Sequence, residues 1–245
     1  MGKISEHKIA LLITGTIVPN SNYVAHTNVE QRRQEYLDAL AFYRSQFLDA
    51  DIFFLENSSH NFESDKPFNE TLRKLRVTLL KFPTSDKFSE GKGYQEFTML
   101  DAAIDQLGDK YSRYVKLTGR YQVHNIRKIA CSENADMTAD SHRKHRVVQT
   151  NVFTVNPAFY KQHIAGAYKE ANDSQGRFIE HVVYGRLKKE KVFNKIELFP
   201  ENPKISGFSG SYGGTLQRNK YKMMLRSVER KLLRVFGFHE FLVEY

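Results

Sequence analysis

Cysteine is almost absent from this sequence, since Cys131 is the only one among 245 residues. A single cysteine excludes an intramolecular disulfide framework and fits a reducing compartment. No run of about 18 apolar residues occurs, so we expect no transmembrane helix. The apolar segment 8–18 directly follows a charged stretch that ends near Glu6, and no small-residue cleavage site comes after it. We therefore expect a strand there rather than a signal peptide.

The common phosphate-binding and nucleophile motifs are also missing. The sequence has no G-x-x-x-x-G-K-[ST], and "GKGYQE" (91–96) carries Glu96 where a dinucleotide motif has its third glycine. "GFSGS" (207–211) misses the spacing of a serine nucleophile elbow, and Cys131 has no evident base. What remains is a glycine-rich loop before a predicted helix. There Lys92 and exposed N–H groups could meet a phosphate, and an ordinary turn is the alternative.

Positive charge is abundant: the formal net charge is +9 and the pI is about 9.4. The basic residues cluster at 127–146, 186–195 and 218–234. Three classes of partner fit such a chain, namely nucleic acid, an anionic membrane surface and a polyanionic small substrate such as a nucleotide. Each cluster also fits an ordinary solvated helix face or loop.

Apolar periodicity predicts strands at 8–18, 50–58, 75–82, 111–121 and 147–155. Helices are predicted between them, one beginning at a capping box of Thr27 and Glu30 and one at 93–109 with Gly108 as its C-cap. Two more are predicted to begin at Asn156-Pro157 and to cover 177–189. This order is α/β, and it predicts a mostly parallel central sheet flanked by helices in a single domain, 1–245.

A last helix is predicted at about 216–236. It is basic, with six Lys or Arg between Lys220 and Arg234, and amphipathic. Such a helix could rest on a membrane surface. Its apolar side is formed by Tyr221, Leu225, Val228, Leu232 and Val235.

Polar residues end three of the predicted strands, in "TGTIVPN", "LENSSHN" and "KLTGRYQVHN". The carboxyl ends of parallel strands lie at one edge of a sheet, and ligands of open α/β sheets bind outside that edge. The sequence therefore predicts a ligand site where these three segments meet.

Three further stretches carry candidate groups. Glu133, Asp136 and Asp140 could hold a divalent cation, or they are solvated. Glu180 and His181 open a predicted helix, where the carboxylate could be a general base or simply favour the helix N-terminus, and the histidine could donate to a phosphate. The segment 203–215, rich in glycine and serine, could be a mobile flap or a plain connection.

The segments "ALLITGTIVP", "DIFFLENS", "GKGYQEFTML", "YVKLTGRYQVHNI", "VVQTNVFTVNPAFY" and "FIEHVVYGRL" together resemble small bacterial glycosyltransferases of capsule and lipopolysaccharide (O-antigen) assembly. The order of elements is similar to a GT-A-type nucleotide-sugar domain, from about residue 8 to about 215. "KLTGRY" is the most specific element. The resemblance implies a cytoplasmic enzyme, peripheral at the inner face of the plasma membrane, that uses a nucleotide-sugar donor and a glycan or lipid-linked acceptor.

The resemblance also implies roles for single residues. "KLTGRY" stands where GT-A enzymes usually carry a metal-binding Asp-x-Asp, which puts Mg²⁺ or Mn²⁺ in question. Lys116 and Arg120 would instead neutralise the donor diphosphate, and the alternative is that Arg120 pairs with a carboxylate inside the fold. Glu180 matches the region of the catalytic base of inverting enzymes. The implied donor-binding residues are Thr14, Gly15, Thr16, Glu56, Asn57, Ser58, Lys92, Lys116, Thr118, Gly119, Tyr121 and His181.

Two other functions use the same features. A nucleic-acid-binding or RNA-modifying protein would use the positive charge and the many Tyr and Phe residues, although no RNA-binding signature occurs. A non-catalytic subunit would bind the nucleotide sugar without hydrolysing it. We favour the glycosyltransferase because the polar groups gather at strand ends.

Overall fold

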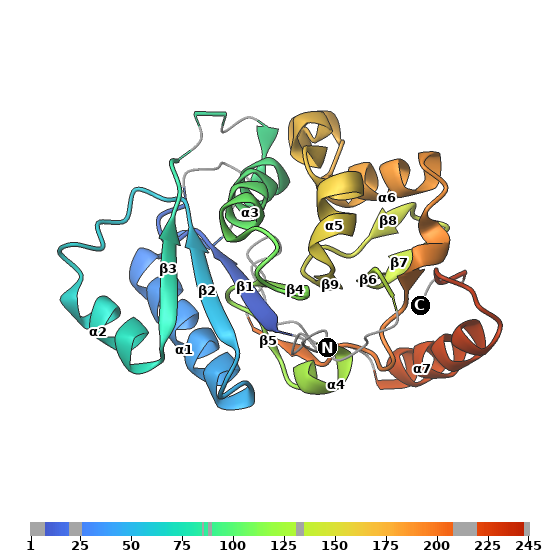
Figure 1. The fold of residues 1–245 in the computed structure, drawn as a ribbon, viewed down its shortest axis with the longest axis horizontal. Coiled ribbons are helices and arrows are strands. Elements are labelled where there is room, and N and C mark those ends of the chain that lie inside the picture. The colour runs from blue at the N-terminus through green and yellow to red at the C-terminus, as the bar shows by residue number, and fades with distance from the viewer. Residues whose placement is uncertain are drawn as a thin grey trace, which may run out of the picture.

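The computed structural model describes residues 8–19, 26–84, 86–87, 90–130, 135–207 and 220–242. Its centre is a seven-stranded sheet in the order β10-β6-β9-β4-β1-β2-β3 (Figure 1). Only β9 runs against its neighbours β4 and β6, and all other neighbouring pairs are parallel. The predicted α/β class with a mostly parallel sheet is confirmed. The strands are β1 (Ile9–Gly15), β2 (Asp51–Glu56), β3 (Val77–Lys81), β4 (Arg113–Thr118), β6 (Met137–Thr138), β9 (Val152–Val155) and β10 (Ile196–Glu197).

Helices cover both faces of the sheet because the side chains of its strands alternate between two apolar cores. In β1, Ala10 and Leu12 enter one core, and Leu11 and Ile13 enter the other. The first core is completed by α3 (Lys92–Leu107), α5 (Pro157–Phe159) and α6 (Ile179–Lys189). The second is completed by α1 (Val29–Gln46), α2 (Lys66–Lys74) and α4 (Ile126–Ala130).

Shorter elements connect these layers. They are β5 (Gln122–Val123), β7 (Ser141–His142), β8 (Val147–Val148), β11 (Ile205–Ser206), a π-helical turn (Tyr160–Ile164) and three 3₁₀ turns at Ala167–Glu170, Asp173–Gln175 and Phe193–Lys195. β11 pairs with β5 in a separate two-stranded sheet, so Ile205 and Ser206 of the predicted flap are held against Gln122 and Val123. Residues 208–215 of that flap lie outside the described residues.

Two local predictions are wrong. The predicted strand 147–155 is divided, because β8 pairs with β7 in a separate hairpin while β9 pairs with β4, and residues 149–151 form a polar break. The cap of α1 is Asn28 rather than Thr27, since Asn28 Oδ1 accepts the Gln31 N–H at 2.9 Å. The predicted caps at Gly108 and Asn156 are confirmed.

The last helix, α7 (Lys220–Val235), lies outside the sheet at one end of the molecule (Figure 1). The predicted helix is confirmed, but its apolar side faces solvent, with Tyr221 81% and Val235 80% exposed. Within the described part of the chain, no helix has the length and apolar character needed to cross a membrane.

Candidate functional site

Two glycines bring the ends of β1 and β4 into close contact. A Cβ on Gly119 would lie 2.4 Å from the carbonyl oxygen of Thr14, and the Gly119 N–H donates to that oxygen at 2.8 Å. A Cβ on Gly15 would lie 2.4 Å from the ring of Phe54. Gly15 and Gly119, both predicted to bind the donor, therefore allow close packing at the strand ends, because a side chain at either position would collide with its neighbours.

Lys116 is the centre of the polar groups at this edge. Its side chain is fully buried, and Nζ lies 2.7 Å from Glu96 Oε1, 3.0 Å from Thr118 Oγ1 and 2.6 Å from the Thr150 carbonyl. These contacts use all three N–H groups of the ammonium. Glu96 also accepts from Thr14 Oγ1 at 2.5 Å. Lys116 is therefore a buried cation that fixes Glu96 between the ends of β1 and β4.

The chain of polar contacts continues from Lys116 to the predicted catalytic base. Thr150, whose carbonyl accepts from Lys116, donates its hydroxyl to Glu180 Oε1 at 2.8 Å. Thr150 belongs to the polar break between β8 and β9, and Glu180 to the first turn of α6. The structure thus joins β1, α3, β4 and α6 through one row of polar side chains.

The N-terminus of α3 meets the 3₁₀ turn Asp173–Gln175 and the N-terminus of α6 at this row, and one glycine allows each contact. A Cβ on Gly91 would lie 2.1 Å from Asp173 Oδ2, and a Cβ on Gly93 would lie 2.6 Å from Ile179 Cγ2. Asp173 Oδ2 accepts the Lys92 N–H at 3.0 Å. The "GKG" stretch is therefore explained by helix packing, which also places Lys92 near Glu180.

Lys92 lies in a mixed electrostatic field. Burial lowers its pKa and Arg120 adds to this, whereas Asp173, Glu180 and Glu96 act in the opposite direction. Burial also raises the pKa of Asp173, against the opposing hydrogen bond from the Lys92 N–H. Lys92 is thus close enough to Arg120, Glu96 and Glu180 to feel the charge of each.

Arg120 is buried at the edge of this site. Its Nη1 donates to Glu35 Oε2 of α1 at 2.9 Å, which is one of the five N–H groups of a guanidinium. The Arg120 charge also lowers the pKa of Arg32, after the larger effect of burial. The pairing with a carboxylate that the sequence left open is present, and it engages one corner of the Arg120 fork.

The predicted residues at the end of β2 hold the loop that follows β1. Glu56 Oε1 accepts the Ile17 N–H at 3.0 Å, Asn57 Oδ1 accepts the Thr16 hydroxyl at 2.8 Å, and Ser58 Oγ accepts the Val18 N–H at 3.1 Å. Glu56, which ends β2, and the two residues after it are all buried. They hold the loop beside the site through the Thr16 hydroxyl and the backbone N–H groups of Ile17 and Val18.

Two predicted residues lie at the margin. His181 is exposed, and its Nδ1 is 3.1 Å from the carbonyl oxygen of Arg146 in the β7–β8 turn, so its hydrogen bond leads away from Lys116. Tyr121 is half-buried and directly follows Arg120, and its carbonyl accepts from Tyr43 Oη at 2.8 Å.

Sequence reasoning gave no role to Glu96, Thr150, Asp173 and Glu35. Glu96 stands in the "GKGYQE" stretch, one turn into α3, and Thr150 is a polar residue inside an apolar run. Each could have been noticed in the sequence, because Glu96 breaks a glycine motif and Thr150 breaks an apolar run. Asp173 and Glu35 carried no signal, because their partners are 81 and 85 residues away.

The carboxylates predicted as cation ligands have other partners. Both oxygens of Asp140 accept from Arg230, at 2.6 and 2.9 Å, and Asp136 accepts from Asn156 Nδ2 at 2.5 Å. Glu133 lies outside the described residues. These contacts neutralise or occupy the oxygens that a cation would need.

A divalent cation does not fit the strand ends either. Mg²⁺ and Mn²⁺ need several oxygen ligands, whereas this edge presents Lys116 and Arg120, with Glu96 already paired to Lys116. Over the described ranges, no group of three or more His, Cys, Asp or Glu side chains could hold a metal.

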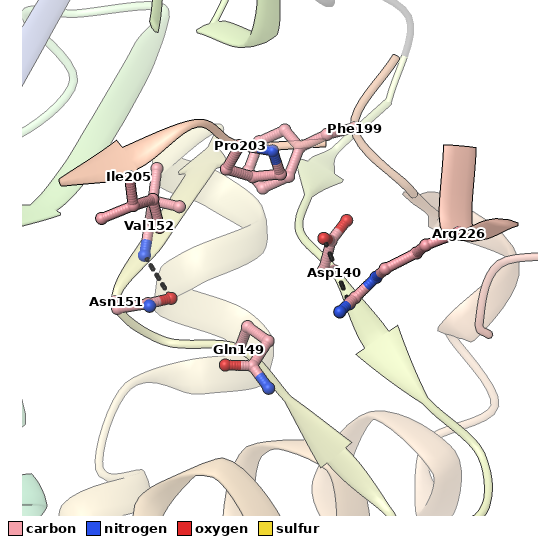
Figure 2. A pocket seen from close by; sticks show the side chains of 8 residues that line it. All are labelled: Asp140, Gln149, Asn151, Val152, Phe199, Pro203, Ile205 and Arg226. Atoms are coloured by element: carbon pink, nitrogen blue, oxygen red, sulfur yellow. Dashed lines mark hydrogen bonds and ion pairs between the residues drawn. The ribbon is translucent and has the colours of Figure 1, made fainter. Parts of the chain in front are cut away.

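A small cavity lies beside the polar break, between β9, the β11 segment and α7 (Figure 2). Its volume is about 70 Å³, which is too small for a nucleotide sugar. Arg226 reaches into it from α7 towards Asp140 (Figure 2). The cavity is lined by Asp140, Gln149, Asn151, Val152, Phe199, Pro203, Ile205 and Arg226.

Comparison with solved structures supports the fold. A protein from Desulfovibrio desulfuricans G20, assigned as a nucleotide-diphospho-sugar transferase, superposes with a TM-score of 0.52 at 8% identity, over 79% of this chain and 80% of the other. A cytidylyltransferase from Leptospira borgpetersenii serovar Hardjo-bovis (strain JB197) gives a TM-score of 0.49 at 11% identity, over 98% and 100% of the chains. No family model and no curated protein matches the sequence.

Identities this low show the fold alone. The GT-A-like arrangement expected from the sequence is confirmed by the first superposition and by the order and directions of the strands. The substrate and the chemistry have to be argued from the site itself.

Proposed function

We propose that this protein is a glycosyltransferase that moves a sugar from a nucleotide-sugar donor to a hydroxyl of a glycan or lipid-linked acceptor. The observation that carries the proposal is the placement of Lys92 near both Arg120 and Glu180 at the carboxyl edge of a GT-A-like sheet, where the buried Lys116 orders the strand ends. Cations there suit a diphosphate, and the carboxylate suits an acceptor hydroxyl.

Arg120 and Lys92 take the charge of the leaving diphosphate in this proposal. Arg120 keeps part of its planar fork for phosphate oxygens, and Lys92 stands at the N-terminus of α3, where the helix dipole favours an anion. Lys116 acts differently. Its three N–H groups hold Glu96, Thr118 and Thr150, so it orders the edge that the phosphates approach.

Glu180 is the general base of the proposed reaction, which inverts the anomeric centre. The acceptor oxygen forms a bond to the anomeric carbon while the bond from that carbon to the diphosphate oxygen breaks. The acceptor proton passes to the Glu180 carboxylate, and the bond pair leaves with the nucleoside diphosphate. The Thr150 hydroxyl donates to Glu180 and orients its carboxylate. A cytoplasmic place in bacterial surface-polysaccharide synthesis belongs to the same proposal.

A thermal-shift screen tests donor binding. UDP, GDP, CMP, dTDP and their sugar conjugates are each added with EDTA and with Mn²⁺, since a ligand of the native state raises Tm. We expect one nucleotide diphosphate to raise Tm in EDTA, and Arg120→Ala to weaken its binding at least about tenfold. Failure of every nucleotide to shift Tm would remove the proposal and favour the nucleic-acid alternative.

Two controls separate the role of Arg120 from its contact with Glu35. Glu35→Gln removes the carboxylate partner and keeps the cation, so donor binding should persist. Arg127→Ala removes an exposed arginine of α4 and should leave binding unchanged. If Arg120→Ala and Glu35→Gln weakened donor binding equally, the role of Arg120 would be to hold α1 in place through Glu35. Release of pyrophosphate from a nucleoside triphosphate, instead of diphosphate from a nucleotide sugar, would point to nucleotidyl transfer.

A further inference from the structure

α7 packs against the rest of the protein with its polar side. Arg230 is 1% exposed and donates to both oxygens of Asp140, to Asn202 Oδ1 at 2.6 Å and to the Phe199 carbonyl at 2.9 Å. Leu233 is the buried apolar residue next to it. A buried, fully bonded arginine therefore fixes the helix, where a surface helix normally uses an apolar stripe.

The apolar stripe of α7 is consequently turned outward. All but Met224, which adjoins Leu225, follow each other at helical spacings of three and four, and all members are between 52% and 81% exposed. Phe236, Phe238 and Leu242 follow the helix in the chain and are also exposed. A contiguous apolar surface of this kind indicates an interaction site. The stripe consists of Tyr221, Met224, Leu225, Val228, Leu232 and Val235.

Positive charge surrounds this stripe. Lys222 and Lys231 are exposed on α7, and the β7–β8 turn, residues 143–146 ("RKHR"), is exposed beside the chain that leaves the helix. The Arg143 N–H donates to the Phe241 carbonyl at 2.9 Å, which fixes that neighbourhood. The one carboxylate of α7, Glu229, accepts the Leu242 N–H at 3.1 Å. The surface is thus apolar in the middle and cationic at its border.

We propose that the outward face of α7 docks on an anionic lipid surface. Aromatic and aliphatic side chains along one side of a helix, with lysines at its border, suit the boundary between headgroups and acyl chains. Each nearby cation adds attraction to anionic headgroups. A second copy of the chain fits less well, because it would bring two cationic borders together in a protein of net charge +9.

Docking in this way needs no rearrangement of the fold. The buried Arg230–Asp140 contact holds α7 against the protein while its stripe stays available. The proposal concerns a surface apart from the strand-end site and does not depend on the proposed glycosyl transfer, so its test needs neither donor nor acceptor.

The experiment is co-sedimentation of the full chain with vesicles of phosphatidylcholine alone or mixed with phosphatidylglycerol. We expect binding to the mixed vesicles that weakens with added salt. Leu225→Asp combined with Leu232→Asp should reduce partitioning at least about tenfold. Both side chains are exposed, so the thermal melting of the double variant should match that of the wild type.

A matched control separates apolar contact from charge. Leu48→Asp, at the end of α1, changes a leucine that is 63% exposed, and it should keep full binding to the vesicles. Equal binding of the α7 single variant Leu225→Asp and Leu48→Asp would overturn the proposal, because attraction would then be electrostatic only. Absence of binding by the wild type would overturn it as well, and so would a dimer in light scattering that Leu225→Asp dissociates.

Discussion

At the scale of single residues, the position of Glu180 depends on side chains that are distant in sequence. Thr150 holds one carboxylate oxygen, Lys92 lies close enough to interact with its charge, and Lys116 binds the carbonyl of the same Thr150. A carboxylate oriented in this way meets the geometric requirement of a general base. The hydrogen bond from the Thr150 hydroxyl to Glu180 could not be predicted from the sequence, because it depends on the break between β8 and β9.

Glu180→Gln tests this role. The amide keeps the shape and the hydrogen bond from Thr150 but cannot take a proton, so turnover should fall about 10²- to 10⁴-fold. The donor affinity, measured by thermal shift, should stay the same. Glu190→Gln, at the other end of α6, is the control and should leave turnover unchanged. Normal turnover of Glu180→Gln would exclude Glu180 as the base.

At the scale of elements, the meeting of α3 and α6 decides whether Lys92 and Glu180 share a site. Gly93 makes this contact possible, since any side chain there would collide with Ile179 at the start of α6. Gly185 lies on the same α6, and a Cβ there would meet nothing within 4 Å. The two glycines therefore differ in function although both lie within helices.

Gly93→Ala and Gly185→Ala should change stability in opposite directions. Overpacking against Ile179 should cost about 1–3 kcal/mol in Gly93→Ala. Gly185→Ala should raise the free energy of unfolding by about 0.5–1 kcal/mol, because alanine favours the helix and meets no obstacle. Urea unfolding measures both. A stabilised Gly93→Ala would contradict the close contact between α3 and α6.

At the scale of the whole molecule, α7 is attached by a long-range polar contact. Arg230 and Asp140 are separated by 90 residues, and their bidentate pair lies in the interior. Helix periodicity alone would place the apolar stripe inward. The observed orientation leaves that stripe for another partner, and the buried charge pair holds α7 together with contacts of Ser227, Leu233 and Arg234.

Arg230→Ala should destabilise the protein by about 3 kcal/mol, because it leaves the Asp140 carboxylate buried without its main partner. The cost falls at the lower end for a broken buried pair, since Arg226 Nη2 remains 3.5 Å from Asp140. Asp140→Asn in the same background should recover part of the loss. Lys231→Ala, at the exposed neighbouring position, should stay within about 0.5 kcal/mol. Urea unfolding and amide exchange of α7 measure these effects. An unchanged free energy of unfolding in Arg230→Ala would show that other contacts hold the helix.

The sequence by itself determined the order of strands and helices, the α/β class and the gathering of polar strand ends at one edge, because apolar periodicity and strand polarity are local properties. It also determined that α7 is amphipathic and basic. Only the tertiary structure decided that Lys116 is buried against Glu96, that Gly93 of "GKG" serves the contact between α3 and α6, and that α7 turns its apolar stripe outward. These features depend on partners tens of residues away. Local sequence patterns do not identify such partners, because only folding brings them into contact.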